Sequence, residues 1–414
     1  MRTMDTHSRR ERDVVGNGTG AGKPNCVSSL TYCTNIHPGE SWREIFRAIR
    51  EHAPAVKAKV SPDRPFPIGL RLSGGAVREM GPADAADFRS WCREGGFYVA
   101  TINGFPYGTF HHRPIKQGVY LPDWRFAERL DYTRKLADLL ALWLPEAMTG
   151  SISSVPVGFR SAIAPEDFPR VRRHLLLALE HLERLARRTG RKIVLALEPE
   201  PGCVAETTQD VVDLFARLDL PASLRPFLAV CYDCCHQALQ FEDPAASLQL
   251  LADHDIAIGH VQVSSALRLT DSRIGLLGRF REPCYLHQTV GRKKSGTLLR
   301  YEDLDLAIAA APEEVEEWRV HFHVPVFLER AGECATTRSF LEKILPLLAE
   351  NGAKLEVETY TWSILPPELQ CGTVTECLVR EIEWVAANLV SCQVSDVAKS
   401  LSNFGLLRGT TEGA

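Results

Sequence analysis

Short runs of apolar residues recur along the chain, and segments with helical spacing separate them. Residues 193–197, Ile-Val-Leu-Ala-Leu, are bounded by charged residues on one side and are followed by Glu, Pro and Gly on the other. Such a run is typical of a strand buried on both faces. Similar runs predict further strands at 30–36, 68–72, 97–102, 151–157, 227–233, 256–263, 320–327 and 355–358.

The segments between the strands carry helix signals. In residues 166–188 the apolar side chains at 171, 175, 178, 182 and 185 form one stripe, and Gly190 ends the helix. Ser41 and Glu44 form a capping box at the start of another helix, which runs to about residue 57. One helix ends at 95–96, one begins at 243, and others are predicted at 125–143, 207–218, 303–311, 337–350 and 374–389.

Strand and helix alternate throughout the chain, which indicates a parallel sheet with helices outside it. We expect a (β/α)₈ TIM barrel formed by residues 28–392 as a single domain, with a disordered tail at 1–27 and a flexible tail at 393–414. Nine strand candidates exceed the eight of a barrel, and Pro325 makes 320–327 the weakest, so this run is expected to lie over the rim. An open doubly wound sheet is the alternative, but no Gly-x-Gly-x-x-Gly follows the first strand.

Composition and charge narrow the range of partners. The chain is 45% hydrophobic and 24% charged, with a formal net charge of -4, so no electrostatic feature favours nucleic acid or an anionic membrane. It has no apolar stretch of about 18 residues and no signal-peptide core, so we expect a cytoplasmic protein without membrane insertion. The 12 cysteines are scattered, and reduced thiols are expected in place of disulfides.

Polar side chains occupy the carboxyl ends of four predicted strands: Glu198, Asp233, Gln262 and Glu358. In a parallel barrel these ends meet at one rim, where the loops that carry chemistry converge. A hard divalent cation binds several oxygen atoms at fixed positions, and strand ends supply them. The alternative for each carboxylate alone is a salt-bridged strand end. Glu200 and Glu356 are rivals, and we expect only one glutamate of each neighbouring pair to face the mouth.

Histidines lie close to these strand ends. His236 follows Asp233 by three residues, so a carboxylate and an imidazole can share one rim. Residues two apart on a strand share a face, and two pairs have this spacing: His260 with Gln262, and His321 with His323. Each of these histidines is either a hydrogen-bonded core residue or a metal ligand.

Two long segments, 104–124 and 265–300, are rich in basic residues and are predicted to be loops. Long loops in a compact domain are usually functional. Lys116, Arg268 and His287 are therefore candidates for binding an anion or hydroxyl groups, as parts of a lid over the mouth. The alternative is a pair of solvated basic loops.

The order of these residues resembles that of the xylose isomerase-like TIM barrels, which include sugar epimerases and endonuclease IV: Glu198, Asp233-x-x-His236, His260-x-Gln262, Arg268, Glu358. More specifically, four runs resemble the EboE family of metabolite traffic proteins: 30–40 (LTYCTNIHPGE), 119–124 (VYLPDW), 321–325 (HFHVP) and 356–362 (EVETYTW). The resemblance covers residues 30–392.

The resemblance implies a metal site. In sugar epimerases a Glu, an Asp, a His and a Glu from successive late strands hold the metal, which places the ligands at Glu198, Asp233, Gln262 and Glu358. His236 and Arg268 fall at substrate positions. Gln262 departs from the family pattern, because its neutral oxygen replaces an imidazole nitrogen and weakens transition-metal binding. In endonuclease IV-like relatives two more ligands come from a segment before the last strand, where His321 and His323 lie in this chain.

The implied activity is that of a sugar or sugar-phosphate isomerase or epimerase that depends on Mn²⁺, Mg²⁺ or Zn²⁺. Glu198 and Glu358, on opposite sides of the substrate, would move a proton through an enediolate. Arg268 and His236 would stabilise the developing oxyanion.

Two other functions stay open. The pair of histidines before the last strand fits the extra ligands of a metal-dependent phosphoester hydrolase. The EboE resemblance instead implies a non-catalytic protein that binds a small polyhydroxylated or anionic metabolite and works with partner proteins of an export system. Fold alone does not choose among the three.

Overall fold

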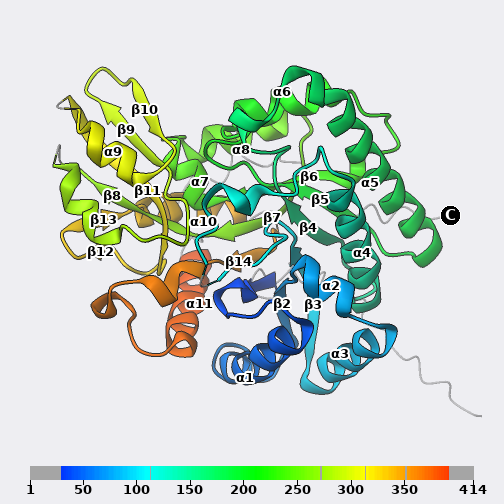
Figure 1. Cartoon of the computed structure of the whole chain (residues 1–414). Coiled ribbons are helices and arrows are strands. Elements are labelled where there is room, and N and C mark those ends of the chain that lie inside the picture. Colours follow the sequence, from blue (N-terminus) through cyan, green and yellow to red (C-terminus); the bar gives the residue numbers. More distant parts are fainter. Residues whose placement is uncertain (1–28, 112, 271–272, 313, 350–351, 391–414) are drawn as a thin grey trace, which may run out of the picture.

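The computed structural model describes residues 29–111, 113–270, 273–312, 314–349 and 352–390. The tails predicted at 1–27 and 393–414 lie outside these residues. Eight parallel strands form a nearly closed barrel with helices between them, as the sequence predicts (Figure 1). These strands are β1 (Leu30–Tyr32), β2 (Phe66–Arg71), β3 (Phe97–Asn103), β4 (Gly150–Ser154), β5 (Ile193–Leu197), β6 (Leu228–Asp233), β7 (Ile258–Val263) and β14 (Leu355–Val357).

Helices cover the outside of the barrel, and the sequence signals for them are confirmed. The predicted stripe of α5 is buried, and Gly190 ends that helix in the left-handed conformation. Ser41 and Glu44 form the capping box of α1. The helices are α1 (Trp42–Val60), α2 (Gly74–Glu79), α3 (Pro82–Gly95), α4 (Ala127–Trp143), α5 (Phe168–Thr189), α6 (Thr208–Leu218), α7 (Cys234–Leu239), α8 (Pro244–Asp253), α10 (Arg338–Ala349) and α11 (Val374–Val390).

The barrel closes between β1 and β2 through one bridge, from Cys33 to Gly69. A Cβ atom on Gly69 would lie 2.3 Å from the carboxyl carbon of Glu356. Glu356 is buried and accepts a hydrogen bond of 2.6 Å from the hydroxyl of Thr101. Glycine is therefore needed at this seam, because Glu356 fills the space beside it.

Between β7 and β14 the chain forms a second sheet of six antiparallel strands, which lies at the left of the barrel in Figure 1. The prediction of a loop at 265–300 is wrong, because three of these strands occupy much of that segment. Helix α9 (Leu304–Ala310) follows them. The strands are β8 (Ser265–Leu269), β9 (Thr289–Lys293), β10 (Leu298–Tyr301), β11 (Val315–Val324), β12 (Arg330–Ala331) and β13 (Cys334–Thr336).

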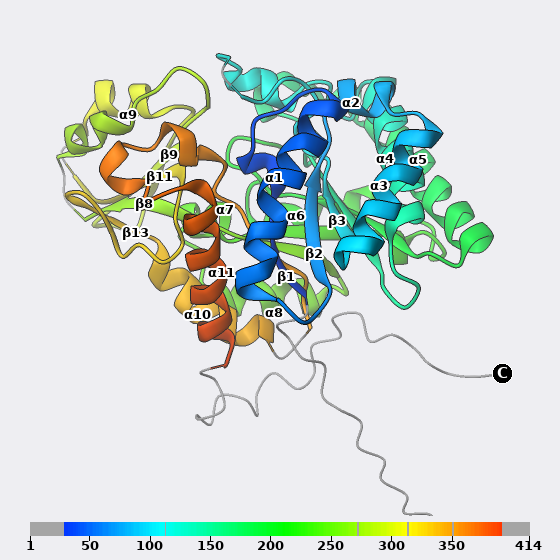
Figure 2. The same ribbon diagram turned by 90° about the horizontal axis from the view of Figure 1, so that it is seen from below.

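The run at 320–327 belongs to β11, which pairs with β8 and β9 and adds no ninth strand to the barrel. The strand ends at Val324, before Pro325, because proline has no N–H to donate to a ladder. The second sheet has its own hydrophobic cluster, with Trp318 and Phe322 of β11 inside it. Figure 2 shows α11 running between this side of the molecule and α1.

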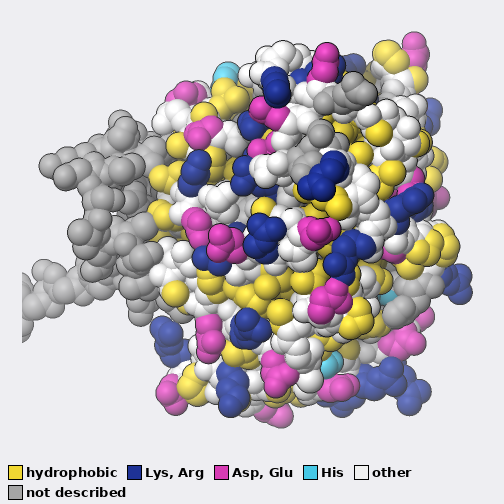
Figure 3. Space-filling view, turned by 90° about the vertical axis from the view of Figure 1, so that its left-hand side faces the viewer, with side chains coloured by type: hydrophobic (Ala, Val, Ile, Leu, Met, Phe, Trp, Pro, Cys, Tyr) yellow, Lys and Arg dark blue, Asp and Glu magenta, His cyan; other side chains and the backbone are white. Residues whose placement is uncertain are grey.

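Acidic and basic side chains are interspersed on the side of the molecule that carries the second sheet (Figure 3). Exposed pairs there include Arg281 with Asp305 and Lys293 with Glu314. Among the described residues, no helix is both long enough and apolar enough to cross a membrane.

Candidate functional site

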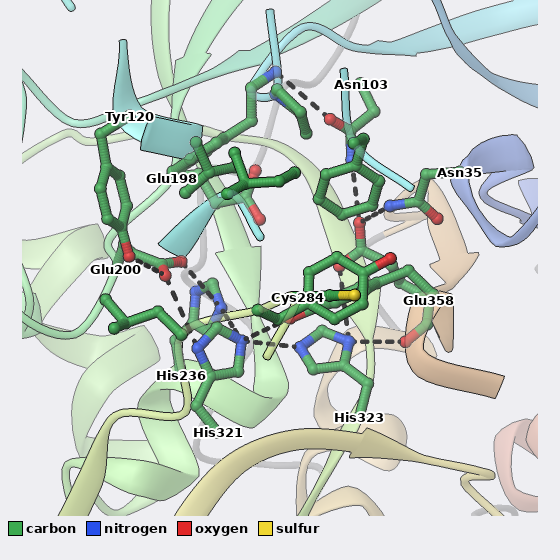
Figure 4. Close-up of a pocket in the computed structure, with 18 of the residues that line it drawn as sticks. Asn35, Asn103, Tyr120, Glu198, Glu200, His236, Cys284, His321, His323 and Glu358 are labelled. Atoms are coloured by element: carbon green, nitrogen blue, oxygen red, sulfur yellow. Dashed lines mark hydrogen bonds and ion pairs between the residues drawn. The ribbon is translucent and has the colours of Figure 1, made fainter. Parts of the chain in front are cut away.

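A pocket lies at the carboxyl ends of the barrel strands (Figure 4). Eight of its polar side chains come from β11 and from five barrel segments that follow or end strands β1, β3, β5, β6 and β14. They are Asn35, Asn103, Glu198, Glu200, His236, His321, His323 and Glu358. Aromatic side chains complete the wall: Phe105, Phe110, Tyr120, Tyr285 and Tyr360. The cavity has a volume of about 60 Å³, which is enough for a metal ion and a few water molecules.

Three histidines direct their Nε2 atoms at one another. His321 Nε2 lies 3.1 Å from His323 Nε2 and 3.2 Å from His236 Nε2. Each Nδ1 atom lies 2.7 Å from an acceptor oxygen: Pro199 O for His236, Gln288 Oε1 for His321 and Glu358 O for His323. Because carbonyl oxygens only accept, the Nδ1 atom of each ring carries a proton. In His321 and His323 the Nε2 atom then presents a lone pair, whereas His236 Nε2 faces Glu200 Oε2 and carries a second proton while its pKa is raised. Hydrogen bonds of this kind, from Nδ1 to a carbonyl oxygen, orient the histidine rings of metal sites.

Carboxylates adjoin the histidine cluster. His236 Nε2 lies 3.0 Å from Glu200 Oε2 and 3.7 Å from Asp233 Oδ2. His323 Nε2 lies 4.0 Å from the same oxygen of Asp233. Two ligand atoms bound to one cation at about 2.1 Å each are separated by about 3–4 Å. Glu200 with His236 and His321, and Asp233 with His236 and His323, are therefore two groups that each fit a cation.

A second group of carboxylates lies beside the first: Glu198, Asp233 and Glu358 place ligand oxygens within 4.8 Å of one another. Asp233 belongs to both groups. Glu358 Oε1 accepts hydrogen bonds of 2.8 Å from the side-chain amides of Asn35 and Asn103. Glu198 Oε2 and Asp233 Oδ2 have no hydrogen-bond partner in the described part of the chain. Two buried acceptors are thus left for a cation or a substrate.

The electrostatics of the pocket agree with this geometry. Burial, with a smaller contribution from Asp233, raises the pKa of Glu198 to about 8, and burial also holds the pKa of Glu358 well above its usual range. Burial lowers the pKa of His323 to about 4. For His236 burial lowers the pKa, but the neighbouring carboxylates outweigh it and raise the pKa to about 9. Without a cation, the pocket therefore favours the protonated forms of Glu198, Glu358 and His236 at neutral pH.

The structure brings together most of the predicted site residues, and it corrects several expectations. The prediction that only one of Glu198 and Glu200 faces the mouth is wrong, because both line the pocket. Glu198 and Glu200 are two residues apart, so even a continuous strand would place both on one face. β5 ends at Leu197, and both glutamates lie in the loop that follows it. Glu356 stays inside the barrel and Glu358 reaches the pocket.

Gln262 and His260 lie in β7 and are not among the residues that line the pocket. Gln262 is in register with Asp233 of β6, and its Oε1 atom has no hydrogen-bond donor among the described residues. His260 contacts Ser151 Oγ at 2.7 Å and Cys231 Sγ at 3.3 Å. Burial lowers the pKa of His260 to about 3, so it is a neutral histidine of the barrel core.

Arg268 and His287 lie outside the pocket. Arg268 of β8 donates a 2.9 Å hydrogen bond to Glu317 in the second sheet. His287 is buried, and its Nδ1 atom lies 2.8 Å from the backbone oxygen of His321. The structure therefore does not bring the two side chains to the mouth, because Arg268 lies in β8 of the second sheet and His287 contacts the backbone of β11.

The segment 104–124 contributes much of the pocket wall. Lys116 lines the pocket, but its ammonium group lies 2.7 Å from Asp303 Oδ2. The hydroxyl of Tyr120 lies 2.9 Å from Glu200 Oε1 and 2.6 Å from Gln288 Nε2. Gln288 thus connects the wall to the histidine cluster, and no sequence signal marks it.

The sequence matches the family model described as xylose isomerase-like TIM barrel over residues 68–292. No curated protein matches it. Similar solved structures include the IolI protein with a binding zinc atom, at 13% identity over 89% of this chain and 99% of that chain, with a TM-score of 0.45. An L-ribulose 3-epimerase is similar at 12% identity over 87% of this chain and 94% of that chain, with a TM-score of 0.46. A D-allulose 3-epimerase from Methylomonas sp. in complex with D-allulose is also similar, at 12% identity over 56% of this chain and 72% of that chain, with a TM-score of 0.38. The resemblance to the EboE family stays a prediction.

Proposed function

Because the chain belongs to the xylose isomerase-like TIM barrel family, we propose that it is a divalent-metal-dependent isomerase or epimerase of a small polyhydroxylated metabolite. The observation that supports this most is that His236, His321 and His323 lie with Glu200 and Asp233 in groups of potential metal ligands at one buried pocket. Mixed nitrogen and oxygen ligands favour Zn²⁺ or Mn²⁺ over Mg²⁺.

The protein's own groups would move the proton. A bound divalent cation polarises a carbonyl and the neighbouring hydroxyl of a substrate. Glu198, with its unpartnered Oε2, takes the proton from the carbon beside that carbonyl. Glu358, held by the amides of Asn35 and Asn103, returns a proton to the enediolate. Return to the same carbon from the opposite face gives an epimer, and return to the adjacent carbon gives an isomer. His236 lies within the histidine cluster, so we assign it to the metal in place of the substrate oxyanion.

The charges at the pocket favour a neutral, hydroxyl-rich substrate over a sugar phosphate. Lys116 is the one Lys or Arg side chain among the described residues that line the pocket, and Asp303 neutralises it. The glutamates of the pocket repel an anion that is not bound directly to a cation. The hydroxyl groups of a sugar both donate to carboxylates and bind a metal.

Deuterium wash-in from D₂O into a panel of ketoses tests this proposal on the metal-loaded protein. Glu198→Gln and Glu358→Gln should each lower the exchange rate at least 100-fold, because general acid–base groups contribute about 10²–10⁴-fold. Glu242→Gln is the control, since Glu242 is largely buried but lies outside the pocket. Elemental analysis of each variant separates lost proton transfer from lost metal. A metal-loaded protein that exchanges no proton on any ketose overturns the proposal.

A specific observation favours a second candidate, a metal-dependent phosphoester hydrolase. Asp233 belongs both to the histidine group and to the carboxylate group, and a shared carboxylate is typical of two-metal hydrolytic sites. Hydrolysis of bis-p-nitrophenyl phosphate by the protein loaded with two equivalents of metal, without wash-in into ketoses, would select this candidate. The net charge of -4 does not favour a DNA substrate.

A further inference from the structure

A second hollow lies beside the pocket, and Gln288 separates the two. It has a volume of about 260 Å³ and takes residues from the loops after β4 and β5, the end of α7, β9 and β10. We propose that this hollow is a subsite for a second hydroxyl-rich unit, such as a sugar ring, attached to the reacting part of the substrate. The inference rests on the proposed function and makes the substrate larger than a single small sugar.

Gln240 supplies the first reason. Its side chain lines the hollow and is only 4% exposed. Its Oε1 atom accepts a 3.1 Å hydrogen bond from Arg300 Nε, but its Nε2 atom has no partner in the part of the chain that the structure describes. A buried N–H group without an acceptor is costly. An oxygen atom of a ligand in the hollow would satisfy it.

Two arginines supply the second reason. Arg160 and Arg300 approach the same carboxylate oxygen, Glu206 Oε1, at 3.7 Å and 3.5 Å. Both separations are longer than a direct hydrogen bond. The other oxygen of Glu206 accepts a 2.9 Å hydrogen bond from the backbone N–H of Gly202. A ligand oxygen that accepts from the guanidinium groups and donates to Glu206 would complete this arrangement.

The balance of charge favours hydroxyl groups over an anion. Arg160 also faces Asp210 at 3.4 Å, and Glu302 lines the hollow, so carboxylates offset the two guanidinium charges. A hydroxyl group both donates and accepts, whereas a fully ionised phosphate only accepts. Phe159 and Tyr301 add aromatic faces to the wall, on which the C–H face of a sugar ring can pack.

Gln288 connects the hollow with the histidine cluster. Its Nε2 atom lies 2.6 Å from the Tyr120 hydroxyl and 3.1 Å from Glu200 Oε1, both of which line the first pocket. Its Oε1 atom accepts the Nδ1 proton of His321. A ligand in the hollow would therefore touch the side chain that orients a proposed metal ligand. This contact places the second unit next to the reacting one.

The test is calorimetric titration of the full-length, metal-loaded protein with neutral disaccharides and with the methyl glycosides of their component sugars. We expect at least one disaccharide to bind about tenfold more tightly than its methyl glycosides. Gln240→Leu and Arg300→Ala should each reduce this advantage to less than threefold. Arg279→Ala is the matched control, because Arg279 is 40% exposed and ion-paired to Glu368, against 42% for Arg300, and lies outside the hollow. It should leave the advantage intact.

A panel in which no disaccharide binds better than its methyl glycosides overturns the subsite, and so does an advantage that survives Arg300→Ala. Binding of inorganic phosphate that depends on Arg300 and is not displaced by any sugar overturns the assignment to hydroxyl groups. The wash-in experiment tests the proposed function separately. Deuterium wash-in into monosaccharides without tighter binding of any disaccharide would support the isomerase and overturn the subsite. A disaccharide advantage that needs Gln240 and Arg300, without wash-in, keeps the subsite and removes the isomerase.

Discussion

His321 and His323 direct their Nε2 atoms at each other across 3.1 Å, while their Nδ1 atoms lie 2.7 Å from Gln288 Oε1 and Glu358 O. The two residues are two apart on β11, so their rings leave the strand on one face. The acceptors fix the tautomer of each ring before any ligand arrives. The strand thus presents two imidazole lone pairs in a prearranged pair.

Replacing either histidine of this pair should remove bound metal. We expect His321→Ala and His323→Ala each to lower the metal content at least tenfold after dialysis, as measured by elemental analysis. His37→Ala is the control, because His37 is buried and contacts the Tyr32 hydroxyl, away from the cluster. Full metal content in the double variant His321→Ala/His323→Ala would contradict the assignment of the cluster.

Glu358→Gln should change stability in opposite directions with and without metal. Two like charges about 4 Å apart repel by about 4 kcal/mol at an effective dielectric constant of 20. In chelator the variant should melt at a higher temperature than the natural protein, because one repelling carboxylate is gone. In excess Mn²⁺ or Zn²⁺ it should melt at a lower temperature, because one anionic ligand is gone. Melting temperatures of both forms that ignore added metal would contradict a cation at this carboxylate group.

Gln262→His should tighten binding of Mn²⁺ or Zn²⁺. Gln262 is in register with Asp233, and its Oε1 atom has no donor among the described residues. An imidazole nitrogen binds these metals better than an amide oxygen. Competition with a metal-sensitive dye should show at least a tenfold lower dissociation constant. Gln237→His, a change of the same kind at a buried residue of α7, serves as the control. An unchanged constant for Gln262→His would mean that the histidines of β11 complete the site without this position.

Glu381 of α11 should make stability depend on pH. It accepts hydrogen bonds from Val326 N at 3.1 Å and Thr359 Oγ1 at 2.7 Å, and burial raises its pKa from 4.5 to about 7. Because the pKa in the folded state is the higher one, the carboxyl group contributes stability that is fully present below about pH 4.5 and is lost as the pH rises through 7. Glu381→Gln keeps an acceptor oxygen but does not ionise.

Urea unfolding at pH 5 and pH 8 measures this effect. A pKa raised from 4.5 to about 7 corresponds to about 3.5 kcal/mol over the whole titration range. The interval from pH 5 to pH 8 covers most of that range, so between these values the stability of Glu381→Gln relative to the natural protein should rise by about 2–3 kcal/mol. Glu383→Gln removes an exposed carboxylate from the same helix and should show little change. Equal changes in both variants would contradict the role of burial at Glu381.

Most of the barrel strands can be predicted because they are apolar runs buried on both faces, and such runs are visible in a local window. β4, Gly-Ser-Ile-Ser-Ser, is the exception, since it is buried but mostly polar. The second sheet cannot be predicted this way. β9 ends in Arg292 and Lys293, and β8 follows β7 after one residue with no Gly or Pro between them. Its pairing joins Leu269 to Trp318, and no local periodicity reports such a distant partner.

The same distinction holds for the candidate site. Glu198, Asp233 and Glu358 can be found from sequence because each ends an apolar strand. The prediction that Arg268 lies at the mouth is wrong because its strand belongs to the second sheet, where Arg268 pairs with Glu317. Gln288 has no signal, since its importance comes entirely from its contact with His321.

The histidine cluster is divided between two parts of the fold. His321 and His323 belong to β11 of the second sheet, whereas Asp233 and His236 belong to the end of β6 and to α7, beside the barrel. A cation bound by both sets is a cross-link between two hydrophobic cores. Docking of the second sheet and cation binding then form one coupled equilibrium, worth about 2.7 kcal/mol at a free cation concentration 100 times the dissociation constant. Loss of the cation would therefore first weaken the contact between the second sheet and the barrel. Because the pocket lies at this contact, its shape would depend on the concentration of available metal.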